Sequence, residues 1–257
     1  MGRGPVMVPQ GRSIVVVHDD LERYHDEQLK ITMADGTGAM TDIRRGFADI
    51  SEGQVRYRTA GEGDPPLVMF HMSPSSSQHL EPLIARLGNS RSVFAPDTLG
   101  NGHSCRPQPA DPTLEYFAEA HLRALDALGI DRFDAYGAHT GAKIGLELAI
   151  THPDRVRKMI LDAVSVRSSA AADELLAGIQ PVEVEDDGTH LMKAWHMVRD
   201  SYLFFPWWKH TAEAKRDLGL PETQALHQEV LEMLASIRTY HLSYRAAIIH
   251  PNQERLP

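Results

Sequence analysis

The chain has 257 residues, of which 42% are hydrophobic and 24% are charged, and its formal net charge is −9. These values are ordinary for a globular protein with one sizeable core. The negative charge and the scattered basic residues argue against nucleic acid and anionic lipid surfaces as partners. The same negative charge leads us to expect a small, uncharged substrate. The apolar runs are too short to cross a bilayer and no secretory signal opens the chain, so we expect a cytoplasmic protein. A single cysteine, Cys105, excludes an intramolecular disulfide.

Residues 1–39 differ from the rest of the chain. They combine a Gly/Pro/Arg opening, one brief apolar run at 14–17, and an acidic-basic stretch with too few apolar positions to bury a face. We therefore predict a disordered N-terminal extension over 1–39, with the folded domain beginning at Met40.

From residue 47 the pattern becomes regular. The predicted elements are, in chain order, two short strands within 47–60, a strand at 67–72, a helix near 78–87, a strand at 92–96 and a helix over 112–128. The run at 67–72 is apolar throughout, which is typical of a parallel strand buried on both faces. This order predicts a doubly wound, mostly parallel α/β sheet over 40–164. In such sheets the functional site forms at the C-terminal ends of the strands.

A strand, a glycine-rich turn and a helix follow one another in residues 132–148, whose sequence is RFDAYGAHTGAKIGLEL. A strand that reverses sharply into a helix needs small residues around the corner, and Gly137, Gly141 and Ala142 meet that need. The corner residue is His139. We expect it above the N–H groups of the helix start, which can hold negative charge. Residues 157–164 supply the next buried strand.

Residues 165–257 change to a helical pattern and predict a cap lying over the strand ends. The helical segments are predicted at 170–179, 190–205, 212–218 and 222–249, separated by Pro and Gly breaks. Three aromatic residues of this region, Tyr202, Phe205 and Trp207, are expected to line an apolar substrate-binding pocket. The alternative is plain helix packing, which aromatic stripes serve more often.

The segment G-A-H-T-G at 137–141 resembles the G-x-S-x-G nucleophile elbow of the α/β-hydrolase fold family, with histidine in place of serine. The segment HMSP at 71–74 resembles the family's H-G-x-P oxyanion-hole loop, and 97–104 resembles its post-strand loop. The resemblance covers roughly 50–164 and the helical cap. It implies an α/β-hydrolase-like fold in which the backbone N–H groups of Ser73 and Thr140 form the oxyanion hole.

The family's last strand pair, whose loops bring the acid and the base histidine, has no counterpart after the cap. We therefore expect a sheet without its last strands, either because the chain is a fragment or because the protein functions without them. A strand left at the edge invites pairing with another chain, so a homodimer through the uncovered sheet edge is expected as one solution.

The chemistry centres on His139. An imidazole has an unperturbed pKa of about 6.5 and carries a free lone pair near pH 7, so it needs no partner base. We expect His139 to act as a nucleophile or as a general base on water, giving altered or weak hydrolysis. The resemblance suggests a small ester, lactone or related carbonyl substrate. The alternative is an inactive copy that binds a small ligand or partner, in which His139 only fills the elbow.

Three further residues are candidates for support. His71 is expected to brace the oxyanion loop, and Asp97 to order the loop at 100–103 through side-chain to backbone bonds. Asp162 lies near the end of the strand after the elbow helix. Its register is unfavourable for a catalytic acid, because the family's acid aligns with Ala163 and neighbouring strand residues face opposite sides.

No cofactor and no metal are expected. A less favoured alternative is a metal-dependent enzyme, because His71, Asp97, His103 and His139 all fall on loops at one edge of the sheet. Their spacing matches no recognised metal motif.

Overall fold

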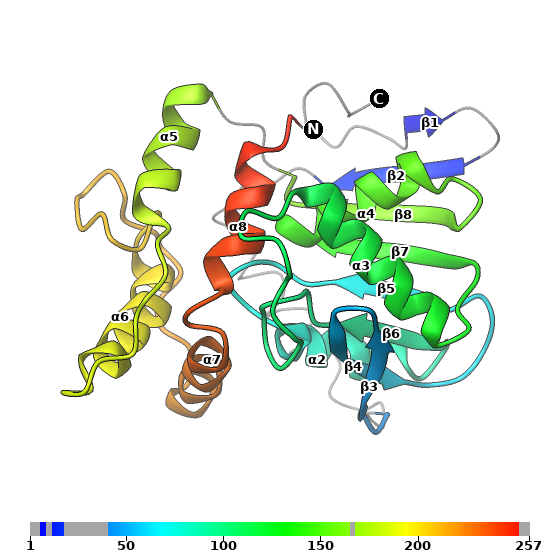
Figure 1. Ribbon diagram of the computed structural model, residues 1–257, viewed down its shortest axis with the longest axis horizontal. Coiled ribbons are helices and arrows are strands. Elements are labelled where there is room, and N and C mark those ends of the chain that lie inside the picture. Colours follow the sequence, from blue (N-terminus) through cyan, green and yellow to red (C-terminus); the bar gives the residue numbers. More distant parts are fainter. Residues whose placement is uncertain (1–5, 9–11, 18–40, 165–167, 252–257) are drawn as a thin grey trace.

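The computed structural model describes residues 6–8, 12–17, 41–164 and 168–251. Its centre is an eight-stranded sheet with the order β1-β2-β8-β7-β5-β6-β4-β3 (Figure 1). The strands are β1 (Val6–Val8), β2 (Arg12–Val17), β3 (Arg44–Ile50), β4 (Gly53–Ala60), β5 (Leu67–Phe70), β6 (Val93–Pro96), β7 (Phe133–Ala138) and β8 (Val156–Asp162). The five strands from β2 to β6 along this order are parallel, and β1, β4 and β3 run antiparallel to their neighbours. The predicted α/β architecture with a mostly parallel sheet is confirmed.

Helices cover both faces of the sheet. They are η1 (Ser77–Leu80), α2 (Glu81–Leu87), α3 (Leu114–Ala127) and α4 (Thr140–Thr151). Alternate residues of β5 point to opposite faces, so Val68 and Phe70 pack in the cluster that contains α3 and α4, whereas Leu67 and Met69 pack with Ile84 of α2. All four residues of β5 are buried, which is why its sequence is apolar throughout.

Four helices, which we call the cap, lie together beyond one end of the sheet (Figure 1). They are α5 (Ser169–Gly178), α6 (Thr189–Leu203), α7 (Thr223–Ala235) and α8 (Tyr240–Ile249). The cap has a hydrophobic cluster of its own, which includes Leu175, Ile179, Met197, Met233 and Tyr240. Helix α8 also packs on α3 and α4, so it connects the cap to the sheet domain.

Two details of the cap differ from the prediction. The helix predicted at 212–218 is wrong, because this segment forms turns and a bridge between Phe204 and Lys215. Its backbone groups bond across to the end of α6 instead, for example Arg216 N–H to Leu203 O over 2.8 Å. The helix predicted at 222–249 is two helices. It is interrupted at Ser236–Thr239, where the Thr239 hydroxyl donates to Gly100 O over 2.6 Å.

The segment 1–39 differs from the predicted disordered extension in two places. Strands β1 and β2 belong to the sheet, and β2 pairs with β8 from Ser13↔Lys158 to Val17↔Asp162. The run at 14–17 is rich in β-branched residues, which favour strands. Because β2 covers β8, that strand is not the sheet edge on which the expected homodimer depended, and dimerisation stays a prediction. The rest of 1–39 lies outside the described residues.

A membrane-spanning helix is not found in the part of the chain that the structure describes.

Candidate active site

The corner between β7 and α4 has the geometry that its glycines predict. His139 adopts φ 50° and ψ −107°, a backbone conformation that is strained for a residue other than glycine. A Cβ atom at Gly137 would lie 2.4 Å from Gly141 O, and one at Gly141 would lie 2.1 Å from Phe70 O. Helix α4 therefore starts in direct contact with the end of β5, which only glycine permits.

Backbone hydrogen bonds fix the corner on both sides. The N–H of His139 donates to Asp162 O at the end of β8 over 2.9 Å. The His139 carbonyl accepts the N–H of Lys143 over 3.3 Å and so begins α4. Since the His139 N–H is already used, the N–H groups at the start of α4, beginning with Thr140, remain as candidates to hold a negative charge.

A cavity of about 610 Å³ separates this corner from the cap. Its floor includes His139, Thr140 and Ser73. Its cap wall is mainly apolar and includes Met197, Val198, Phe204, Phe205, Trp207 and Met233. The predicted pocket residues Tyr202, Phe205 and Trp207 thus line the same cavity as the predicted oxyanion and nucleophile residues. His71, Asp97 and Asp162 lie behind the cavity wall rather than in it.

His71 is fully buried beneath the loop 71–77. Its Nε2 accepts the N–H of Thr98 over 2.9 Å, so its Nδ1 carries the proton and donates to Met72 O over 2.7 Å. Burial lowers the pKa of His71, which keeps the ring neutral. Because both ring nitrogens are engaged, His71 braces the loop and has no ligand atom left for a metal.

Ser73 carries one of the two expected oxyanion N–H groups. Its hydroxyl lies 2.9 Å from the hydroxyl of Ser243 on α8. Ser243 in turn accepts a hydrogen bond from Asn101 Nδ2 over 2.9 Å. The cap helix α8 therefore contacts the loop 71–77 directly.

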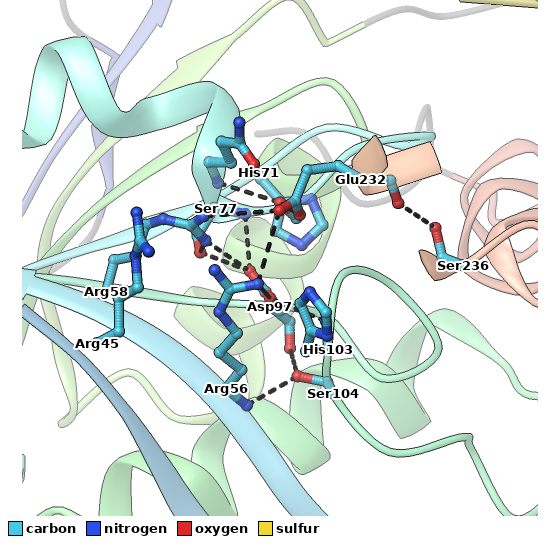
Figure 2. A network of polar contacts seen from close by, with 12 residues as sticks. Arg45, Arg56, Arg58, His71, Ser77, Asp97, His103, Ser104, Glu232 and Ser236 are labelled. Carbon is cyan, nitrogen blue, oxygen red and sulfur yellow. Dashed lines mark hydrogen bonds and ion pairs between the residues drawn. The ribbon is translucent and has the colours of Figure 1, made fainter. Parts of the chain in front are cut away.

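Asp97 has no exposed surface and anchors the other end of this loop (Figure 2). Its Oδ1 accepts the N–H of Ser77 over 2.8 Å and the hydroxyl of Ser77 over 2.5 Å. Its Oδ2 accepts the N–H of His103 over 3.3 Å. Two arginines of β4 lie close to the carboxylate, with Arg58 Nη1 3.8 Å from Oδ1 and Arg56 Nη1 3.9 Å from Oδ2. Asp97 therefore orders two loops and holds no position in the cavity.

Asp162 is buried at the end of β8. Its carboxylate accepts the hydroxyl of Tyr136 over 2.6 Å, and its backbone pairs in register with Ala138. The structure therefore uses this side chain to join β7 to β8.

The four residues of the alternative metal site do not converge. Among the described residues, the one group of possible ligands whose donor atoms all lie within 4.8 Å of one another is Glu115, Glu147 and His250, which shares no member with that set. His250 Nε2 lies 3.3 Å from Glu115 Oε1 and 3.5 Å from Glu147 Oε2.

Several polar residues of the cavity were not predicted. Lys143 is buried and its Nζ donates to Ala247 O over 2.6 Å. Burial lowers the pKa of His79 to about 4, so this cavity histidine is neutral near pH 7. On α7, burial raises the pKa of Glu229, which accepts the Tyr202 hydroxyl over 2.5 Å. Lys143 had a signal in the sequence, since a spacing of four residues places it on the helix face of His139. The others depend on tertiary contacts.

Comparisons with known proteins agree with this geometry. A family model described as alpha/beta hydrolase fold matches residues 65–181. The 2-hydroxymuconate semialdehyde hydrolase of Pseudomonas putida is 39% identical over 112 residues, which cover 41% of this chain and 39% of that protein. The haloalkane dehalogenase 2 of Mycobacterium tuberculosis is 33% identical over 113 residues, covering 44% of this chain and 39% of that protein. The matched stretch therefore spans about two fifths of the length of these curated relatives.

Solved structures extend the similarity beyond that stretch. The enol-lactonase from Burkholderia xenovorans LB400 superposes with a TM-score of 0.58 at 22% identity, covering 80% of this chain and 73% of that one. An epoxide hydrolase from an endophytic Streptomyces superposes with a TM-score of 0.62 at 18% identity, covering 83% and 74%. Its strand order, its strained corner after β7 and these similarities show that the chain has an α/β-hydrolase fold, and residues 65–181 match the model of that fold family.

Proposed function

We propose that this protein hydrolyses a small ester, lactone or related carbonyl compound in the cavity between the corner and the cap, with His139 as the reacting residue. The observation that carries the proposal is the position of His139. It occupies a strained corner at the start of α4 and lines a cavity whose opposite wall is apolar. Strained backbone of this kind concentrates at functional sites. The similar proteins named above act, by their names, on small organic compounds, which supports the same size of substrate here.

Two routes fit the arrangement. As a nucleophile, the neutral imidazole of His139 attacks the carbonyl carbon. The ester C–O bond breaks, and the alkoxide takes the proton of the other ring nitrogen. Water then hydrolyses the neutral acyl-imidazole, which releases the acid and restores the imidazole. As a general base, His139 takes a proton from a water molecule that attacks the carbonyl directly. In both routes the carbonyl oxygen becomes negative. The N–H groups of Ser73 and Thr140 would hold that charge, and one such donor is typically worth about 10² to 10³ in rate.

A rapid-quench experiment with intact-mass detection tests the proposal on p-nitrophenyl esters and γ-lactones of graded size. Transient acylation of the peptide that contains His139 supports the nucleophilic route, and turnover without an adduct supports the general-base route. Binding of these compounds with no hydrolysis above the buffer rate contradicts the proposal and favours the inactive ligand-binding alternative.

A further inference from the structure

Two cap residues, on different helices, form hydrogen bonds with the oxyanion loop. Ser243 of α8 contacts the hydroxyl of Ser73 over 2.9 Å. Glu232 of α7 accepts a short hydrogen bond from the hydroxyl of Ser76. The peptide that carries the Ser73 N–H therefore lies between two attachments to the cap.

Glu232 belongs to a buried ionic network rather than to the surface (Figure 2). Its Oε1 lies 3.6 Å from Arg56 Nη1 and 3.8 Å from Arg58 Nη2, and the two arginine side chains are 9% and 1% exposed. Arg58 also donates from Nη1 to the hydroxyl of Ser77 over 2.7 Å. Ser77 closes the loop by its bonds to Asp97. Ion pairs and hydrogen bonds thus connect Glu232 of the cap, the two arginines of β4 and Ser77 of the oxyanion loop in one network.

This network depends on the cap being in place. Arg56 Nη1 is buried and makes no hydrogen bond with any described residue, so its charge is balanced by the nearby oxygens of Glu232 and Asp97. Removing Glu232 would leave a buried cation with one anion fewer, which is strongly unfavourable. Glu232 also lines the cavity, so a compound bound there lies against the network.

We propose that Glu232 and Ser243 are positioning residues, which hold the Ser73 N–H in place from the cap. Docking of the cap and assembly of the oxyanion hole are then one event, and the loop 73–77 is correctly placed only when α7 and α8 are seated. The inference rests on the proposed hydrolysis. Catalytic donors must be held closely, since a displacement of about 1 Å can cost on the order of 10² in rate.

The test compares Glu232→Gln, Ser76→Ala and Ser243→Ala with wild type on an ester that the wild type hydrolyses. The matched control is Glu222→Gln, which removes the same charge from the exposed start of α7. We expect kcat to fall about tenfold or more in each of the three variants, with KM changed less than about threefold. The double variant of Ser76 and Glu232 should lose less than the sum of the two single variants, because the Ser76–Glu232 hydrogen bond is broken in both.

Hydrogen–deuterium exchange of the peptide covering 72–78 gives a second readout that needs no turnover. Exchange should rise in Glu232→Gln and Ser243→Ala and stay at the wild-type level in Glu222→Gln. If Glu232→Gln fails to fold, Ser243→Ala decides the matter, because it changes no charge and Ser76→Ala also removes the acceptor of the Gln78 N–H within the same peptide. Unchanged kcat together with unchanged exchange would overturn the positioning role. Exchange that rises in a protein without hydrolytic activity would instead refute the proposed function and leave the cap-to-loop coupling intact.

Discussion

The backbone N–H of His139 donates to the carbonyl of Asp162 across 2.9 Å, which ties the corner after β7 to the end of β8. On the other side, the start of α4 at Gly141 abuts the carbonyl of Phe70 at the end of β5. The strained φ of 50° at His139 is therefore held by packing against two neighbouring strands. The same two contacts place His139 at the cavity floor.

Gly141→Ala should destabilise the fold by about 2 kcal/mol or more, because the new Cβ would lie 2.1 Å from Phe70 O and α4 would have to shift. Urea unfolding measures the loss. Gly129→Ala is the matched control, since its φ is +70° but nothing lies within 4 Å of its Cβ position, and it should cost only about 1 kcal/mol. Equal losses in both variants would contradict close contact between α4 and β5.

Asp97→Asn should lower the free energy of unfolding by about 3 kcal/mol or more. It removes an anion from beside two buried arginines, Arg56 and Arg58, whose charges then lack part of their balance. The control is Asp126→Asn, which removes the 2.6 Å ion pair between Asp126 and Arg155. Because the Asp126 side chain is 55% exposed, this change should lower the free energy of unfolding by less than about 1 kcal/mol. A small loss at Asp97 would show that the network is not an anchor.

The buried His121 should make the folded protein less stable as the pH decreases. Burial lowers the pKa of this histidine to about 3, whereas the unfolded chain takes up the proton near pH 6.5. Between these values the unfolded state binds more protons, so stability falls as the pH decreases below about 6.5, by up to about 1.4 kcal/mol per pH unit for this group. His121→Gln should reduce that slope between pH 6 and pH 4.

The control for this series is His227→Gln, which removes an exposed imidazole from α7 and should keep the wild-type slope. Chemical denaturation at half-unit pH steps gives both slopes. An unchanged slope in His121→Gln would mean that His121 is not held neutral in the folded protein.

The buried Glu229 should have the opposite effect and make the folded protein less stable as the pH rises. Burial raises the pKa of its carboxyl, with the Tyr202 hydroxyl bond acting weakly against that shift. The folded state then holds the proton more tightly than the unfolded state, so stability falls as the pH rises above about 4.5. Glu229→Gln should therefore be more stable than wild type at pH 8, and the advantage should shrink by pH 4. A variant less stable than wild type at pH 8 would show that the ionised carboxylate is favoured there.

Local features of the sequence were enough to predict strands β3 to β8 and the corner. The apolar sequence of β5 follows from burial of the strand on both faces. Glycine is required at 137 and 141 because a Cβ atom there would collide with the start of α4 or the end of β5. The break between α7 and α8 was missed, because it depends on a contact from Thr239 to Gly100 that lies far along the chain.

The contacts between the cap and the loop 71–77 could not be predicted from the sequence for the same reason. Nothing in the sequence around Glu232 distinguishes it from a surface carboxylate on a helix, and only the folded structure brings it to Ser76, Arg56 and Arg58. Strand β2 likewise follows from its pairing with β8, since a short β-branched run alone does not specify a partner.

The most direct measurement is kcat/KM of His139→Ala and His139→Asn against wild type on one hydrolysed ester or lactone. Asn tolerates the left-handed backbone region better than Ala, so it keeps the corner while removing the imidazole. We expect kcat/KM to fall by at least about 10² in both variants, with the fold retained by circular dichroism. Wild-type turnover in a folded His139→Asn protein would contradict the central role of His139.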